Sequence, residues 1–137
     1  MHQSPDDPDS FRKLGGIIPG TPGTHAYALS GPKPSALPVL IAVPHAGRAY
    51  SEPLLKALRH PDTASLRLED RLADSIGRAV ASQTGAGLLV ANAPRAMIDL
   101  NRAPEDIDWE MFGRDDRPVV GLDEPSRRVR SGLGLIP

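Results

Sequence analysis

The chain has 137 residues, with 16 Lys or Arg against 17 Asp or Glu and a formal net charge of −1. This balance gives no general attraction to nucleic acid or to an anionic membrane, and the 39% content of hydrophobic residues indicates one globular domain. Because the chain has no cysteine, it has neither disulfides nor a thiolate zinc cluster, and any metal site must use His, Asp and Glu.

The first 37 residues form a segment rich in Pro and Gly, which interrupts any long regular element. We expect residues 1–12 to be a mobile tail and residues 25–29 to form a short edge strand. No signal peptide is visible, and no apolar run approaches the roughly 20 residues that span a bilayer. The sequence therefore predicts a cytoplasmic protein that binds neither nucleic acid nor membrane.

Residues 38–137 carry the pattern of an α/β domain. Residues 38–43 are apolar on both faces, which predicts a strand buried on both sides. Ser51 is a candidate N-cap for a short helix. A longer helix is predicted over residues 66–84, where apolar residues four apart form a stripe made of Leu68, Leu72, Ile76 and Val80.

Two further strands are predicted, over residues 87–92 and 96–100. The order of strand, helices, strand and strand indicates an α/β fold in which a mixed sheet has flanking helices and a right-handed crossover. The chain ends in an apolar run, residues 132–137, whereas termini are normally solvated. We therefore expect the domain to be truncated.

His45 directly follows the first of these strands and precedes Ala46 and Gly47, small residues that allow close backbone approach. Ligands of open α/β sheets bind at the carboxyl ends of strands, where an imidazole can bind a metal or transfer a proton. The alternative is a histidine that only hydrogen-bonds to nearby backbone.

Glu69 and Asp70 are adjacent acids, and Asp74 lies one helical turn beyond Asp70. Arginines in the same segment allow these acids to form a solvated face with local ion pairs. The alternative is that one of the two adjacent acids reaches a metal held by His45.

Several arginines are candidates for binding an anion. Asn101 and Arg102 follow the predicted strand at 96–100, and the planar fork of Arg suits a carboxylate because it donates two parallel hydrogen bonds. A surface ion pair is the alternative. Arg95, before that strand, and Arg127 and Arg128, near the end of the chain, are further candidates for an anionic small molecule or an intramolecular carboxylate.

Four blocks of the sequence, in this order, resemble the N-formylglutamate amidohydrolase family. They are VPHAG at 43–47, LEDR at 68–71 with Asp74, IDLNRAPED at 98–106, and SRRVRSGLGLIP at 126–137. Each block alone is weak, but the ordered set is specific. The resemblance extends from about residue 38 to the last residue and does not include the N-terminal segment.

The resemblance implies a zinc-carboxypeptidase-like α/β fold and hydrolysis of an N-acyl amino acid, with N-formyl-L-glutamate as the reference substrate. It also implies a zinc ion, or another divalent metal ion, bound by His45 and by Glu69 or Asp70, which polarises the amide carbonyl and lowers the pKa of a bound water. Asn101 and Arg102 resemble the pair that holds the substrate carboxylate in carboxypeptidases and aspartoacylases.

Two features depart from the wider group of zinc hydrolases. Arg48 stands where a carboxylate follows the first histidine by three residues. The later Asp-x-His-Ser block, which would supply another metal ligand, has no counterpart in the sequence, and the general base is expected beyond residue 137.

Three hypotheses follow from these observations. The first is an N-formylglutamate amidohydrolase-like, zinc-dependent hydrolase of a small N-acyl amino acid, represented by an inactive N-terminal fragment. The second is a degenerate, non-catalytic module that binds a carboxylate ligand or a partner chain. The third is an aspartoacylase-type deacylase, which uses the same chemistry on a different acyl group.

Overall fold

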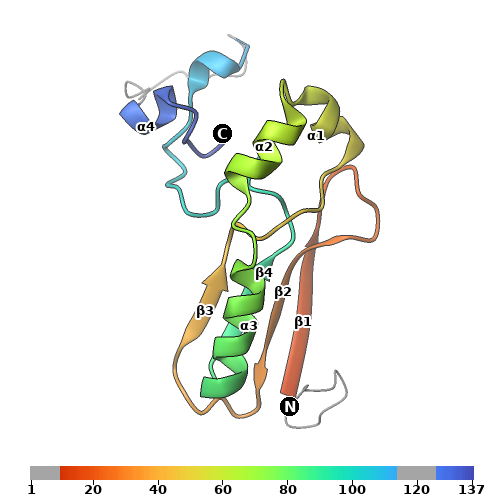
Figure 1. Ribbon diagram of the computed structural model, residues 1–137, viewed down its shortest axis with the longest axis vertical. Helices are drawn as coiled ribbons and strands as arrows, with labels where there is room; N and C mark the ends of the chain where they lie inside the picture. The colour runs from red at the N-terminus through yellow and green to blue at the C-terminus, as the bar shows by residue number, and fades with distance from the viewer. Residues whose placement is uncertain (1–9, 114–125) are drawn as a thin grey trace.

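The computed structural model describes residues 10–113 and 126–137. Its centre is a mixed sheet with strand order β1-β2-β4-β3. β1 (Ser10–Ile17) and β2 (His25–Pro32) are antiparallel, β2 and β4 (Gly87–Ala91) are antiparallel, and β3 (Leu40–Val43) runs parallel to β4 (Figure 1). The expected α/β fold with a mixed sheet and flanking helices is confirmed.

The N-terminal hairpin differs from the expectation. β1 begins at Ser10, inside the segment predicted as a tail, and β2 extends the predicted strand to Pro32 and lies between β1 and β4 instead of at an edge. Gly20 and Gly23 in the connecting turn both have φ of +79°, which glycine adopts without strain. The glycines therefore make a hairpin possible in a segment that composition alone marks as irregular. Residues 1–9 lie outside the described ranges.

Three helices connect β3 to β4, namely α1 (Glu52–Ala57), α2 (Pro61–Leu68) and α3 (Ala73–Thr84). As predicted, the Ser51 hydroxyl caps α1 and accepts the Leu54 N–H at 3.3 Å. The predicted helix over residues 66–84 is instead two helices, because Leu72 has φ of +69° and a right-handed helix cannot continue through it. Glu69 and Asp70 lie in the bend between them.

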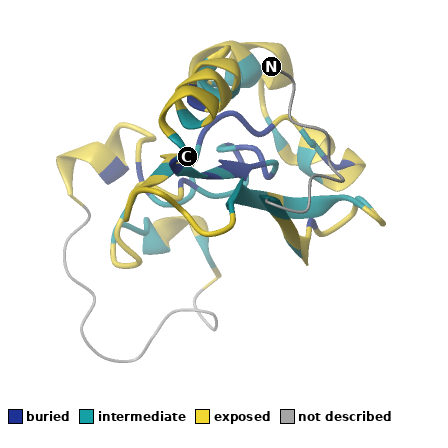
Figure 2. Cartoon of the chain, turned by 90° about the horizontal axis from the view of Figure 1, so that it is seen from below, coloured by how far each residue is buried: buried dark blue, intermediate teal, exposed yellow. Residues whose placement is uncertain are grey.

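Helix α3 packs on one face of the sheet through small residues. Gly77 is buried, and a Cβ there would lie 2.8 Å from a methyl group of Val43. Leu72, Ile76 and Val80 are 67%, 64% and 44% exposed, and the outer side of α3 is open to solvent (Figure 2). The predicted apolar stripe does not face the core, because the small residues beside it allow the closer approach to the sheet.

The other face of the sheet carries an open apolar groove of about 430 Å³, whose lining includes Tyr27, Leu40 and Leu89. β3 is an edge strand and Leu40 is 54% exposed. The prediction that residues 38–43 are buried on both faces is therefore wrong. Among the described elements, helix α3 covers only the face that carries Val43 and Val90.

The predicted strand over residues 96–100 is a turn. The Met97 N–H donates to Pro94 O at 2.9 Å, and the Asp99 N–H donates to Leu135 O at 2.8 Å. The Asp99 side chain accepts the Asn101 N–H at 2.9 Å, a local bond that competes with strand pairing. This turn therefore joins the C-terminal segment instead of the sheet.

Beyond this turn lie η1 (Trp109–Met111) and α4 (Arg127–Arg130). Both lie at the end of the molecule toward which β3 points, together with α1 and α2 (Figure 1). None of the described helices is long and apolar enough to cross a membrane.

Candidate functional site

The site lies where β3 and β4 end. Because these strands are parallel, their carboxyl ends meet at one edge of the sheet. His45 follows β3, and the next loop lies against the segment after β4, with the Ala49 N–H donating to Asn92 O at 3.2 Å. A Cβ at Gly47 would lie 2.0 Å from the Ala93 carbonyl oxygen, so only glycine permits this approach.

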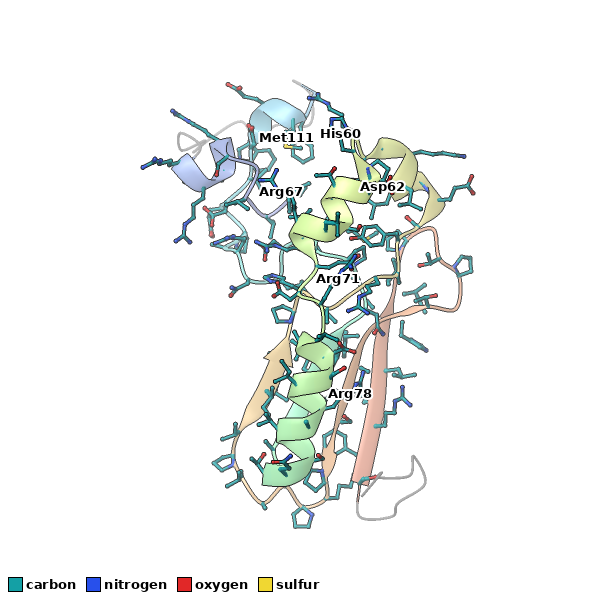
Figure 3. All side chains as sticks on the ribbon, in the orientation of Figure 1. His60, Asp62, Arg67, Arg71, Arg78 and Met111 are labelled. Atoms are coloured by element: carbon teal, nitrogen blue, oxygen red, sulfur yellow. The ribbon has the colours of Figure 1, made fainter. Side chains whose placement is uncertain are left out.

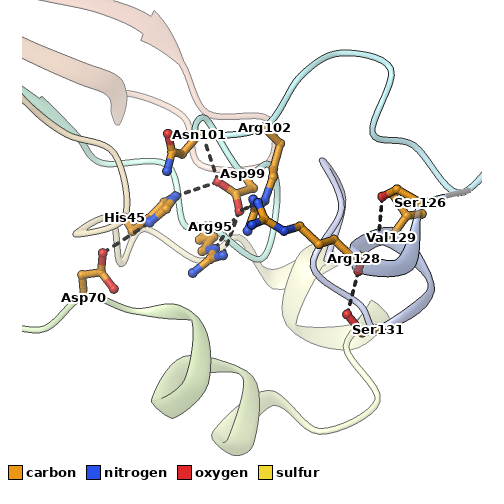
Figure 4. A network of polar contacts seen from close by, with 10 residues as sticks. All are labelled: His45, Asp70, Arg95, Asp99, Asn101, Arg102, Ser126, Arg128, Val129 and Ser131. Atoms are coloured by element: carbon orange, nitrogen blue, oxygen red, sulfur yellow. Dashed lines mark hydrogen bonds and ion pairs between the residues drawn. The ribbon is translucent and has the colours of Figure 1, made fainter.

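Asp99 is the centre of the site and has an exposed fraction of 0%. Its Oδ1 lies 2.7 Å from His45 Nε2 and accepts the Asn101 N–H at 2.9 Å. Its Oδ2 accepts from Arg95 at 2.9 and 3.0 Å and lies 3.3 Å from Arg102 Nε (Figure 4). One buried carboxylate thus holds an imidazole and two guanidinium groups.

The contacts of Asp99 determine its charge. Burial alone would raise the pKa of Asp99, but hydrogen bonds from the Asn101 N–H and His45, together with the charge of Arg95, lower that pKa below its usual value. Asp99 is therefore ionised at neutral pH and can only accept hydrogen bonds. It follows that His45 Nε2 carries a proton and donates a hydrogen bond to Asp99 Oδ1.

Asp70 lies on the other side of His45. Its Oδ2 is 3.3 Å from His45 Nδ1, and its N–H donates to His45 O at 2.9 Å. When the ring carries its single proton on Nε2, Nδ1 and the carboxylate are both acceptors and face each other. Either a second proton on the ring or a cation bound by both groups satisfies this arrangement.

Glu69 points into a different cluster. Its side chain is 6% exposed and lies 3.4 Å from Arg48 Nε and 3.7 Å from Arg71 Nε. Burial and the Glu69 carboxylate raise the pKa of the neighbouring Tyr50 to about 12. Arg48 therefore neutralises Glu69, and of the two adjacent acids only Asp70 contacts His45.

The other arginines near these acids have different positions. Arg67 lies on α2 and Arg78 on α3, whereas Arg71 lies in the bend between the two helices (Figure 3). Of these three, Arg71 is the one that forms an ion pair with an acid within the described ranges. The local ion-pair interpretation thus applies to Glu69 and not to Asp70.

The structure brings together most of the predicted anion-binding residues. Arg95 and Arg102 contact Asp99, and the Asn101 backbone belongs to the same turn. The Arg128 side chain reaches from α4 toward Arg102 (Figure 4). Arg127 is exposed on the same helix, and no contact with another described residue places it in the site.

Asp99 was not among the predicted site residues. The signal was its position two residues before the Asn101–Arg102 pair, but the apolar neighbours Ile98 and Leu100 favoured a strand there. An ionisable residue between apolar neighbours, next to candidate binding residues, is the feature that could have revealed it.

In the described ranges, no group of three or more His, Cys, Asp or Glu side chains could hold a metal ion. Two ligands of a tetrahedral zinc, each at about 2.0 Å, lie roughly 3.3 Å apart. His45 Nδ1 and Asp70 Oδ2 have this separation. Catalytic zinc sites use three protein ligands, so the described residues by themselves do not fit a catalytic zinc.

Comparison with known proteins identifies the family to which the chain belongs. The crystal structure of an N-formylglutamate amidohydrolase from Ralstonia eutropha superposes with a TM-score of 0.65 and 32% sequence identity, over 81% of this chain. The chain spans 38% of the length of that protein. None of the curated proteins is similar enough to count as a relative. The family model of N-formylglutamate amidohydrolases matches residues 37–137, and the chain therefore belongs to this family.

Proposed function

We propose that this chain takes part in the hydrolysis of N-formyl-L-glutamate to L-glutamate and formate, by providing the residues that bind and orient the substrate. In this reaction the water oxygen bonds to the formyl carbon, the carbon–nitrogen bond breaks, and the amine nitrogen gains a proton. The observation that supports the proposal best is the buried Asp99 carboxylate, which holds His45, Arg95 and Arg102 together.

Arg102 is the proposed ligand of the α-carboxylate, with Asn101 beside it. The Arg102 side chain is 15% exposed and contacts Asp99 through Nε. The two terminal nitrogens of its fork can therefore donate parallel hydrogen bonds to a substrate carboxylate. Because Asp99 is buried and ionised, it orients this fork before the substrate arrives.

His45 is the proposed polar group at the scissile amide. Asp99 fixes the ring through Nε2, so Nδ1 faces Asp70 and the outside of the network. The exposed fraction of the Asp70 side chain is 56%, whereas that of His45 is 8%. This edge of the imidazole is therefore the one that a bound substrate or cation can reach through Asp70.

Because the chain belongs to this family, we also propose that the reaction depends on zinc and that the fold is zinc-carboxypeptidase-like. Such a site would use His45 and Asp70, in place of Glu69, and would require at least one ligand besides them. A carboxylate that hydrogen-bonds to the far nitrogen of a ligating histidine is the usual outer-shell partner of a zinc ligand, and Asp99 has this position relative to His45.

Titration calorimetry on residues 1–137 tests the substrate-binding role. N-formyl-L-glutamate is compared with N-formyl-4-aminobutyrate, which keeps the side-chain carboxylate and lacks the α-carboxylate. Wild type should prefer N-formyl-L-glutamate. Arg102→Lys keeps the charge, loses the bidentate geometry, and should weaken binding of N-formyl-L-glutamate by about 1.5–3 kcal/mol.

Arg78→Lys is the matched control, because Arg78 is exposed on α3. It should bind both compounds as wild type does. If wild type does not distinguish the two compounds, or if Arg102→Lys and Arg78→Lys behave alike, Arg102 does not bind the α-carboxylate and the proposal fails.

A further inference from the structure

We propose that Arg128 binds the second carboxylate of the substrate and makes the site selective for N-acyl amino acids with an acidic side chain. The inference rests on the proposed function, in which Arg102 binds the α-carboxylate. Helix α4, which lies outside the sheet and its crossover helices, would then select acidic over neutral substrate side chains.

The backbone near Arg128 is tied to the turn that carries Arg102. Arg128 O accepts the Leu133 N–H at 2.9 Å, and Leu135 O accepts the Asp99 N–H at 2.8 Å. The Leu135 N–H donates to Asp106 O at 2.6 Å, so Leu135 bonds to this part of the chain on both sides. The position of α4 relative to Asp99 and Arg102 is therefore determined by hydrogen bonds.

The ends of α4 are also fixed. The Ser126 hydroxyl accepts the Val129 N–H at 3.3 Å, and the Ser131 hydroxyl donates to Arg128 O at 2.8 Å. Val129 is 6% exposed and anchors the helix. Arg128 itself is exposed, and its side chain extends toward Arg102 and Asp99 (Figure 4). An anchored backbone with an exposed guanidinium suits a ligand-binding arginine.

Asp99 is not the partner that would satisfy Arg128. Each of its oxygens already has at least two contacts, with His45 and Asn101 on Oδ1 and with Arg95 and Arg102 on Oδ2. A carboxylate has about four lone-pair sites. Within the described ranges no acid lies within ion-pair distance of Arg128.

The charges on this side of the site therefore favour a doubly negative ligand. Arg95 and Arg102 already share the one charge of Asp99, and Arg128 adds a third guanidinium that points toward them. Like charges repel, and an anion between them removes that repulsion. N-formyl-L-glutamate carries two carboxylates, one for Arg102 and one for Arg128.

Titration calorimetry on the full chain, with N-formyl-L-glutamate and N-formyl-L-glutamine, tests this assignment. The two compounds differ only in the side-chain end group, which is a carboxylate in the first and a neutral amide in the second. Wild type should bind N-formyl-L-glutamate about tenfold more tightly than N-formyl-L-glutamine, because the amide loses one charge-assisted hydrogen bond with Arg128. Higher salt should reduce the preference, because the guanidinium is exposed.

Arg128→Ala should abolish the preference by weakening the binding of N-formyl-L-glutamate alone, and Arg128→Lys should keep part of it. Arg127→Ala removes an exposed arginine from the same helix and should leave the preference unchanged. The melting temperatures of these variants should match that of wild type, so that a loss of preference reports binding and not folding.

The outcomes separate this inference from the proposed function. If Arg128→Ala keeps the full preference, or Arg127→Ala loses it equally, the assignment of Arg128 is overturned. If wild type binds N-formyl-L-glutamate more tightly than N-formyl-4-aminobutyrate but no more tightly than N-formyl-L-glutamine, the α-carboxylate site stands and the inference about Arg128 fails. If wild type binds none of the compounds, both proposals fail.

Discussion

Asp99→Asn should destabilise the protein much more than a surface substitution does. The amide keeps the size of the side chain and removes its negative charge. Arg95 and Arg102, which are 14% and 15% exposed, then lose their anionic partner. One end of the amide is an NH₂ group, which must face donors, either His45 and the Asn101 N–H or the two arginines.

The expected loss is about 3 kcal/mol. Removing one member of a buried ion pair costs about 3–5 kcal/mol, and the lower end applies because both arginines retain some contact with water. For a chain of this size the melting temperature should fall by roughly 10 °C. Urea unfolding at neutral pH, followed by circular dichroism, should show a lower midpoint with an unchanged slope.

The pH dependence provides an independent check. The pKa of Asp99 is lowered in the folded state, so its contribution is complete above the usual Asp pKa of about 4 and is lost as the pH falls through the folded-state value. Asn does not titrate at this position. The stability difference between wild type and Asp99→Asn should therefore shrink as the pH falls below about 4.

Glu52→Gln is the matched control for the change from carboxylate to amide. Glu52 pairs with Lys56 on α1, and its side chain is 75% exposed. The change in stability should stay below about 0.5 kcal/mol. If Asp99→Asn behaves like Glu52→Gln at neutral pH, or if its deficit persists undiminished in acid, Asp99 does not organise the site electrostatically.

Two further predictions concern metal binding and the exposed face of α3. Zinc should bind residues 1–137 weakly, with a Kd above about 1 μM, because His45 and Asp70 supply two of the three protein ligands of a catalytic site. Stoichiometric zinc binding with a submicromolar Kd, abolished by His45→Ala, would show that a further ligand is present. The exposed apolar side chains of α3 should make the chain self-associate, and Ile76→Glu should lower this self-association in sedimentation experiments with little change in melting temperature, because Ile76 is 64% exposed. Ser75→Glu, at an exposed neighbouring position, is its control, and equal effects of both variants would argue against an apolar contact.

Local sequence patterns predicted the parts of the fold that local physics controls. The apolar run before His45 predicted β3, Ser51 predicted the cap of α1, and the run at 87–92 predicted β4. Each of these depends on neighbours within a few residues. The position of His45 at a strand end followed from the same local pattern.

The features that long-range contacts decide could not be predicted in this way. The four-residue spacing of Leu72, Ile76 and Val80 is typical of a buried stripe, but Gly77 allows α3 to pack closely through a different side. The left-handed conformation of Leu72 breaks the helix, and in the resulting bend the Glu69 side chain contacts Arg48 whereas the Asp70 side chain contacts His45. Helical spacing alone therefore could not determine which acid contacts His45.

Asp99 shows why this site and this fold cannot be separated. A buried carboxylate is stable only when cations and donors surround it, and here they come from the loop after β3, from Arg95 and from the turn at Asn101 and Arg102. The C-terminal segment joins the same turn through the Asp99 N–H. Asp99→Asn is therefore expected to reduce binding and stability together, whereas the exposed Arg128 should alter ligand preference alone. Binding measurements on Arg128 variants thus test recognition without the loss of stability expected at Asp99.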